Sequence, residues 1–287
     1  MNLARLLPDA PTADLLVAML RGGPPAVDAC PRALLPLLYD MVRRNGLPLD
    51  PETVTYLRSA YVTESLRSRA YAAIVDELAA LLSGAPFLLL KGAAVGPLYY
   101  ADPALRHAHD IEILVGTSSR AALAGSRFRP VGRHYVHASG LPLRVYTRLF
   151  VPRFSFDERS LWQSAIAMPN GLRTVSAADA LALTLVHASR SVSRLSGRWA
   201  CDAHAIVRHG DVDWSRFLHT VTTTGAALAV TAQLHWLRDT LDLPVPTDVL
   251  AALDTHRAGP IERFVIARGL AIADSSRPNR LWRRVLR

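Results

Sequence analysis

The sequence predicts an α+β fold, in which a small mixed β-sheet is flanked by an N-terminal and a C-terminal helical region. Three observations predict this class. Apolar residues repeat at helical spacing in the first part of the chain, short runs typical of strands follow, and helical spacing then returns. The predicted domains are an N-terminal helical region (1–84), an α/β core (85–156) and a C-terminal helical region with a basic tail (157–287).

The N-terminal region contains its clearest predicted helix at 63–82. Apolar residues follow one another there at steps of four and three, which is the spacing of one buried helix face. The stripe consists of Leu66, Ala70, Ile74, Leu78 and Leu81. Ser83, Gly84 and Pro86 end the helix.

The core is predicted to contain strands and a turn. The apolar run 87–90 is too short for a helix, and Lys91, Gly92 and a stretch of small residues follow it, which predicts strand, turn and helix. Residues 110–115 alternate carboxylates with β-branched and apolar residues and predict a second strand. The segments 133–137 and 143–150 predict a hairpin around Gly140.

The C-terminal region is predicted to be helical, with glycines, threonines and prolines between its helices. The predicted helices are 177–187, 199–207, 214–222 and 226–241. The last eleven residues, from Arg277, contain five arginines and no acidic residue.

Composition excludes several classes of protein. The 287 residues are 50% hydrophobic, which excludes a disordered chain, and two distant cysteines, Cys30 and Cys201, indicate neither a disulfide framework nor a zinc site. A reducing cytoplasm is the expected location. Prolines and aspartates interrupt the first twenty residues, so we expect no signal peptide and no membrane span. The net charge of +9 comes almost entirely from arginine, a sign of coding bias, and Lys91 is the only lysine.

The predicted strand at 110–115 contains the main candidate for chemistry. Residues two apart on a strand share a face, so Asp110 and Glu112 are expected to lie roughly 6 to 7 Å apart along the chain. Carboxylate oxygens are the ligands that Mg²⁺ takes, and metal ions can hold the oxygens of a phosphoryl transfer. The alternative is an exposed strand face without a ligand.

The turn at Lys91 and Gly92 is a second candidate. A cation, a flexible backbone and the N–H groups that open a helix meet there, which is a reasonable cradle for a triphosphate. The sequence contains neither a G-x-x-x-x-G-K-[ST] nor a G-x-G-x-x-G motif.

In order and spacing, LLLKGAAVGPLYYADPALRHAHDIEILV at 88–115 resembles the uncharacterised nucleotidyltransferase family, of the polymerase-β-like superfamily. That family has an LKG turn, a Tyr-rich helix, an Arg and a D-I-D-L-L-V strand. The resemblance covers roughly residues 60–245 and continues in elements with the family's LW, A-x-D-x-L…H, R-W-x-x-D and DW patterns. These are Leu161-Trp162, Ala178 through His187, Arg198 through Asp202, and Asp213-Trp214.

The resemblance implies a nucleotidyltransferase that moves a nucleoside monophosphate from a triphosphate, expected to be ATP, to a hydroxyl or phosphate acceptor with Mg²⁺. It places Mg²⁺ on the catalytic pair Asp110 and Glu112, and the triphosphate on Lys91, Gly92 and Arg106. Glu112 stands where Asp is commoner. The acceptor stays open between a small molecule, a peptide, tRNA and a protein side chain.

One departure from the family pattern concerns the strand LRVYTRL. It resembles the family's v-D-l-H-w-r-l, which puts Arg144 at a third carboxylate and Tyr146 at a histidine. An arginine there removes the negative charge that would help to bind a second cation. The arginine could instead pair with Asp110 or Glu112, or contact a phosphate. Asp157 and Glu158 are replacement candidates for the missing carboxylate.

Two further hypotheses therefore stand beside the transferase. The first is a catalytically degenerate member that binds a nucleotide, an RNA or a partner protein without chemistry. The second is a nucleic-acid-binding module that uses the basic tail and an acid-free segment between Glu112 and Asp157. The arginines of that segment are 120, 127, 129, 133, 144, 148 and 153.

Overall fold

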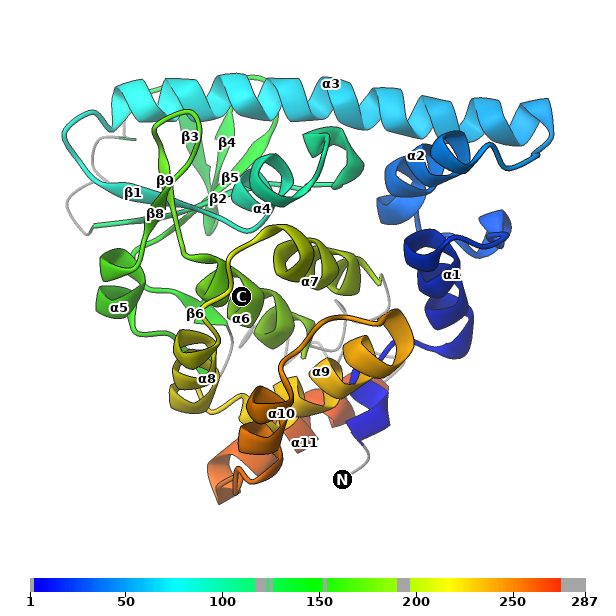
Figure 1. The fold of residues 1–287 in the computed structure, drawn as a ribbon. Coiled ribbons are helices and arrows are strands. Elements are labelled where there is room, and N and C mark those ends of the chain that lie inside the picture. The colour runs from blue at the N-terminus through cyan, green and yellow to red at the C-terminus, as the bar shows by residue number, and fades with distance from the viewer. Residues whose placement is uncertain (1–2, 117–122, 124–125, 152–153, 190–196, 275–287) are drawn as a thin grey trace. The chain divides into compact units, whose positions relative to one another are not determined.

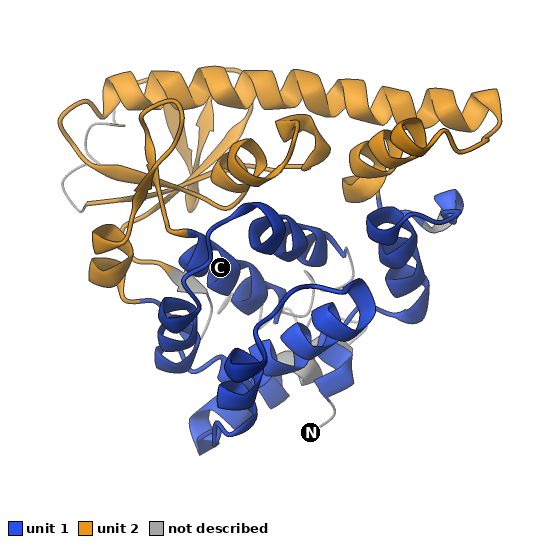
Figure 2. Ribbon diagram, in the orientation of Figure 1, with its two compact units in different colours: residues 1–31, 150–156, 177–287 blue, residues 32–149, 157–176 orange. Residues whose placement is uncertain are grey.

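The computed structural model describes residues 3–116, 123, 126–151, 154–189 and 197–274. The chain forms two compact units, coloured separately in Figure 2, and each unit uses more than one stretch of the sequence. The sheet unit comprises residues 32–149 and 157–176, and the helical unit comprises residues 1–31, 150–156 and 177–287. Among the described residues, no helix is both long and apolar enough to span a bilayer.

The sheet unit combines helices with a seven-stranded sheet (Figure 1). Its helices are α2 (Leu35–Asn45), α3 (Pro51–Leu81), α4 (Gly92–Tyr99) and α5 (Glu158–Gln163), with the 3-10 turns η3 (Arg32–Leu34) and η4 (Pro103–Leu105). Its strands are β1 (Phe87–Leu90), β2 (Ile111–Val115), β3 (Phe128–Val131), β4 (His134–His137), β5 (Pro142–Tyr146), β8 (Ile166–Ala167) and β9 (Arg173–Thr174).

The strand order is β3-β4-β5-β2-β1-β9-β8. β1 runs antiparallel to β2, whereas β2 and β5 are parallel, so the predicted mixed sheet is confirmed. The predicted hairpin is also confirmed, because β4 and β5 pair antiparallel, although β5 ends at Tyr146. β3 was not predicted, since it contains Pro130, a residue that sheets accept mainly at their edges.

α3 is longer than the helix predicted at 63–82. Asp50 caps its N-terminus by accepting a hydrogen bond from the backbone N–H of Thr53 at 2.8 Å, and Pro51 occupies the first turn, where its missing N–H costs nothing. The prediction that Leu66 is buried was wrong, because 62% of its surface is exposed. The buried face instead passes through Glu64, and Leu66 lies about 200° around the helix from it.

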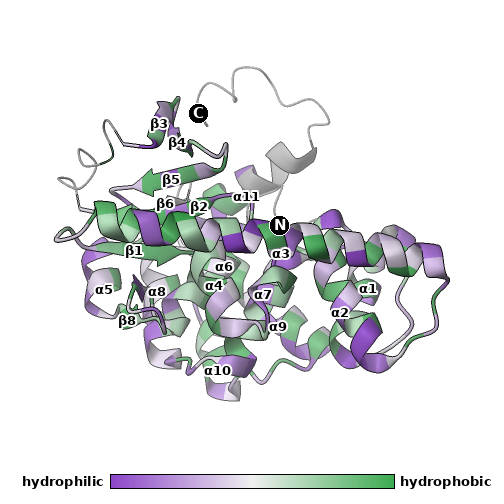
Figure 3. Ribbon diagram, turned by 90° about the horizontal axis from the view of Figure 1, so that it is seen from above, coloured by the Kyte–Doolittle hydropathy of each residue, from purple (hydrophilic) through white to green (hydrophobic). Residues whose placement is uncertain are grey.

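The core of the sheet unit lies between α3 and one face of the sheet. Buried residues of α3 pack there against alternate residues of the strands, and Figure 3 shows β1 as hydrophobic along its whole length. The core includes Tyr71, Ile74, Val75 and Leu78 of α3 with Leu89, Ile111, Ile113 and Leu143 of the sheet. In the register, Glu112 stands opposite Leu90 on one side and Arg144 on the other, so these three residues share the opposite face of the sheet.

The helical unit contains the four helices predicted for the C-terminal region. They are α6 (Ala177–Ala188), α7 (Arg198–His209), α8 (Trp214–Thr223) and α9 (Ala227–Leu241). The unit also contains η1 (Leu3–Leu6), α1 (Ala10–Arg21), η2 (Val27–Ala29), β6 (Phe150–Val151), β7 (Phe154–Ser155), α10 (Thr247–Asp254) and α11 (Pro260–Asp274). β6 and β7 pair antiparallel as a separate two-stranded sheet.

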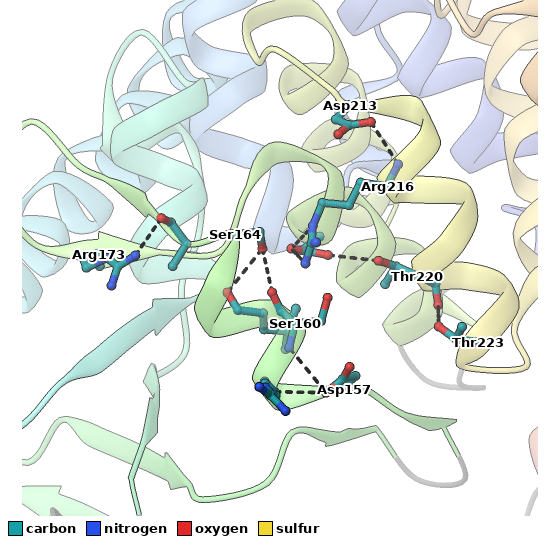
Figure 4. Close-up of polar contacts among 12 residues, drawn as sticks. Asp157, Ser160, Ser164, Arg173, Asp213, Arg216, Thr220 and Thr223 are labelled. Atoms are coloured by element: carbon teal, nitrogen blue, oxygen red, sulfur yellow. Dashed lines mark hydrogen bonds and ion pairs between the residues drawn. The ribbon is translucent and has the colours of Figure 1, made fainter.

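A buried carboxylate joins two of these helices. Asp179 of α6 is fully buried, and its Oδ2 accepts a hydrogen bond from Arg216 Nε at 2.8 Å, while its Oδ1 accepts one from Thr220 Oγ1 at 3.1 Å. Both donors are on α8, whose N-terminus is capped by Asp213 (Figure 4). Asp179 and Asp213 therefore hold structural positions within the helical unit.

Candidate functional site

The turn between β1 and α4 is held in an unusual backbone conformation. Lys91 has φ 46°, which is in the left-handed region that side chains other than glycine rarely adopt. A residue held in such a region costs on the order of 1 to 3 kcal/mol, and such residues cluster at functional sites. In the described part of the chain, the backbone N–H groups of Gly92 and Ala93 find no acceptor, so two donors at the start of α4 are available to a ligand.

The side chain of Lys91 forms an ion pair with Glu112 of β2. Its Nζ lies 2.7 Å from Glu112 Oε2 and 3.1 Å from Oε1. Only 8% of the Glu112 side chain and 21% of the Lys91 side chain are exposed. Because the carboxylate is almost fully buried, its charge depends on this ammonium group for compensation.

The second carboxylate, Asp110, is paired in the same way. It lies directly before β2, and Arg144 Nε of β5 is 2.5 Å from its Oδ2. The register places Arg144 opposite Glu112 on the neighbouring parallel strand. This is one of the pairings that the sequence had left open for Arg144, and each of the two carboxylates therefore has its own basic partner.

These contacts affect the protonation of neighbouring groups. Burial lowers the pKa of Arg144, but the electrostatic interactions with Asp110, Tyr146 and Glu112 together raise it by more. The pKa of Arg144 is therefore raised overall. Burial, reinforced by the charge of Glu112, raises the pKa of Tyr146 to about 12. Tyr146 is therefore protonated at neutral pH and does not act as a general base there.

The Arg106 side chain lies next to Gly92 of the β1–α4 turn. It directly follows η4, is 8% exposed, and its Nη1 donates to the backbone carbonyl of His107 at 3.3 Å. A Cβ added at Gly92 would collide with the Arg106 guanidinium, so glycine allows this close approach. Asp110, Glu112, Lys91, Gly92, Arg106 and Arg144 thus all belong to the sheet unit.

The two replacement candidates for the third carboxylate have structural contacts instead. Asp157 caps α5 by accepting hydrogen bonds from the backbone N–H groups of Arg159 and Ser160 (Figure 4). Glu158 Oε1 accepts the backbone N–H of Leu149 at 3.0 Å. Of the acid-free segment, Arg144 and Arg148 are exposed, whereas Arg120, Arg153 and the basic tail lie outside the described residues.

The residues present do not fit a resident Mg²⁺. Asp110 and Glu112 supply the right oxygen donors, but both are neutralised by Arg144 and Lys91, and the four side chains together have no net formal charge. Among the described residues, no group of three or more His, Cys, Asp or Glu side chains could hold a metal ion. A cation would have to displace two ion pairs before it reached the carboxylates.

A buried polar cluster on α3 was not anticipated from the sequence. Glu64 is 4% exposed, and its Oε2 lies 2.6 Å from Arg67 Nη1 and 2.7 Å from His107 Nδ1. Its Oε1 accepts the backbone N–H of Ala108 at 3.1 Å, and His107 Nε2 lies 3.1 Å from His109 Nδ1. The signal in the sequence was a carboxylate seven residues before Tyr71, two helical turns away on the same buried face of α3.

We expect Glu64→Gln to be less stable than the parent at pH 7, and the difference to shrink as the pH falls from about 5 to 3. Burial raises the pKa of Glu64, but the hydrogen bonds from His107 and Ala108 and the charges of His107 and Arg67 together lower it below its ordinary value of 4.5. A carboxylate with a lowered pKa stabilises the fold above its unfolded pKa and loses that effect as pH falls through the folded value.

Urea unfolding of both proteins at pH 7, 5, 4 and 3 measures this difference. Glu52→Gln, an exposed carboxylate in the first turn of the same helix, is the control. A Glu64→Gln effect that stays constant over the whole range would contradict the assignment.

Comparisons with known proteins find a family that matches most of the chain. The model of a family described as "Uncharacterised nucleotidyltransferase" matches residues 31–242, which is well over half of the chain. No curated protein and no solved structure matches.

Proposed function

Because the chain belongs to the uncharacterised nucleotidyltransferase family, we propose that it binds a nucleoside triphosphate, such as ATP, at the β1–α4 turn without a resident metal ion. Family membership supports a nucleotide as the ligand. The observation that favours binding without metal is that both carboxylates form ion pairs, Glu112 with Lys91 and Asp110 with Arg144.

The proposed contacts follow from the chemistry of the turn. The N–H groups of Gly92 and Ala93 and the start of the α4 dipole favour an anion. Arg144 is the more accessible cation, since 57% of its side chain is exposed, and its guanidinium has donors beyond the Nε that binds Asp110. A phosphate can therefore be bound without the loss of either ion pair.

The second candidate is transfer of a nucleoside monophosphate to a hydroxyl or phosphate acceptor with Mg²⁺. The specific observation in its favour is that Asp110, directly before β2, and Glu112, on β2, are both present, with Glu112 opposite Leu90 at the end of β1. It requires Lys91 and Arg144 to leave the carboxylates, and the identity of the acceptor as small molecule, peptide, tRNA or protein is part of this proposal.

Titration calorimetry with ATP, GTP, CTP and UTP in EDTA and in MgCl₂ tests the two candidates. We expect triphosphate binding in EDTA, less than a twofold change with Mg²⁺, and unchanged or tighter binding in Asp110→Ala, which releases Arg144. Arg144→Gln is expected to weaken binding roughly tenfold, since hydrogen bonds to charged groups contribute about 1.5 to 3 kcal/mol.

The matched control is Arg148→Gln, which removes an exposed arginine two residues after the end of β5 and should leave affinity unchanged. Binding that requires Mg²⁺ and disappears in Asp110→Ala, with transfer of label from an α-labelled triphosphate, would establish the second candidate instead. Binding in neither buffer would contradict both.

A further inference from the structure

A pocket of about 260 Å³ lies within the sheet unit, between α3 and the segment that runs from β1 through α4 to η4. One wall is a single stripe of α3, whose residues follow helical spacing. The stripe consists of Glu64, Ser68, Tyr71, Ala72, Val75 and Asp76. From Glu64 to Asp76 the stripe extends about 18 Å at 1.5 Å per residue, so the pocket is elongated along the helix.

The pocket is hollow because the residues that face α3 are small. Gly92, Ala93 and Ala108 form part of the opposite wall, and Leu89 and Met168 supply apolar surface. Small side chains leave a space that neighbouring groups do not fill, and an apolar lining favours a ligand with an apolar body.

Several polar groups of the wall have no partner in the described part of the chain. Tyr71 is 7% exposed, yet its hydroxyl makes no hydrogen bond. Three further groups likewise have no hydrogen-bond partner there: the Ser68 hydroxyl, the Asp76 carboxylate and the Asn170 amide NH₂. The other amide atom of Asn170, Oδ1, accepts the backbone N–H of Leu172. These groups line the pocket, so their donors and acceptors are available to a ligand that supplies hydrogen bonds.

The charges of the wall decide the kind of ligand. Of the three charged residues in the wall, Glu64 is compensated by Arg67 and His107, and Arg106 donates to the backbone carbonyl of His107, whereas Asp76 has no ion-pair partner among the described residues. Asp76 is exposed and stands at one end of the stripe. The end of the pocket near Asp76 therefore favours a cation, and the part lined by Tyr71, Val75 and Met168 favours an apolar group.

We propose that this pocket binds a small amine with an apolar body, its ammonium group at Asp76 and its body against Tyr71, Val75 and Met168. The site goes beyond the proposed nucleotide function, since the amine contacts Asp76, Tyr71, Val75 and Met168, although Gly92, Ala93 and Arg106 form part of the same pocket wall. The pKa of Tyr71 is raised to about 12 by burial and then by the charge of Asp110, so its hydroxyl is a donor at neutral pH.

The test uses three probes with the same ring and different end groups: 2-phenylethylamine, 2-phenylethanol and phenylacetate. Their dissociation constants are measured by ligand-observed NMR titration on the full chain at pH 7. We expect the amine to bind roughly two- to fivefold more tightly than the alcohol, the range for an exposed ion pair, and phenylacetate to bind most weakly. Asp76→Asn should remove the preference for the amine.

Two neighbouring alanines of α3 provide a matched pair of variants. Ala72→Trp fills the pocket and should abolish binding of all three probes, whereas Ala73→Trp adds the same side chain at an exposed position that does not line it. Thermal unfolding verifies that both variants are folded. Equal affinity for the three probes, the tightest binding by phenylacetate, absence of binding, or binding that survives in a folded Ala72→Trp variant would overturn the proposal.

Discussion

Lys91→Met is expected to lower the free energy of unfolding by about 3 kcal/mol, the lower end of the range for breaking a buried ion pair, because Lys91 is about one-fifth exposed. The loss arises from Glu112, which stays almost fully buried without a compensating charge. Urea unfolding followed by circular dichroism at pH 7 measures it.

The double variant Lys91→Met/Glu112→Leu is expected to regain most of this stability, since apolar pairs often replace buried ion pairs without loss. Arg44→Met, which breaks an ion pair with Asp40 at an arginine 61% exposed, is the control and should cost only about 0.5 kcal/mol. If Lys91→Met were as mild as Arg44→Met, the Lys91–Glu112 pair would not be formed in solution.

Arg144→Asp should create a metal site at Asp110 and Glu112. The substitution removes the partner of Asp110 and adds a carboxylate on β5, opposite Glu112 in the register. Two unit charges 4 Å apart interact by about 1 kcal/mol even in bulk water. The substitution makes the charge of the site more negative by two units, so the attraction of a divalent cation to the site increases by about four such interactions. After screening by salt, we expect Mn²⁺ affinity to rise at least tenfold.

Electron paramagnetic resonance titration with Mn²⁺ measures this gain. Arg148→Asp makes the same change in charge at an exposed arginine outside the ion pairs and should give no comparable increase. Tight Mn²⁺ binding by the parent itself would contradict the neutralised site and would favour metal-dependent transfer.

The central strands could be predicted because their patterns are local. Four consecutive apolar residues at 87–90, ended by Lys91 and Gly92, specify a short buried strand and a turn, and alternation at 110–115 specifies the next one. The resemblance to the family brought Arg144 close to Asp110 and Glu112, but the parallel pairing of β2 with β5 was not predicted, because a pairing between distant segments has no local signal.

The ion pairs and the pocket could not be derived in full from the sequence. A sequence shows that Arg144 has two possible carboxylate partners, but the choice of Asp110 depends on side-chain reach across two strands. Glu64 was missed because its role depends on His107 and Ala108, some forty positions away, which meet α3 only in the folded unit.

The interleaving of the two units affects how the chain can fold during synthesis. The chain passes between the units four times, after residues 31, 149, 156 and 176. The sheet unit has all its residues once Ser176 has left the ribosome, whereas α1 must wait for α9 and for Asp242 directly after it, with which Arg21 forms an ion pair. The apolar face of α1 is therefore without its partners during most of translation, and no single continuous fragment contains either unit alone.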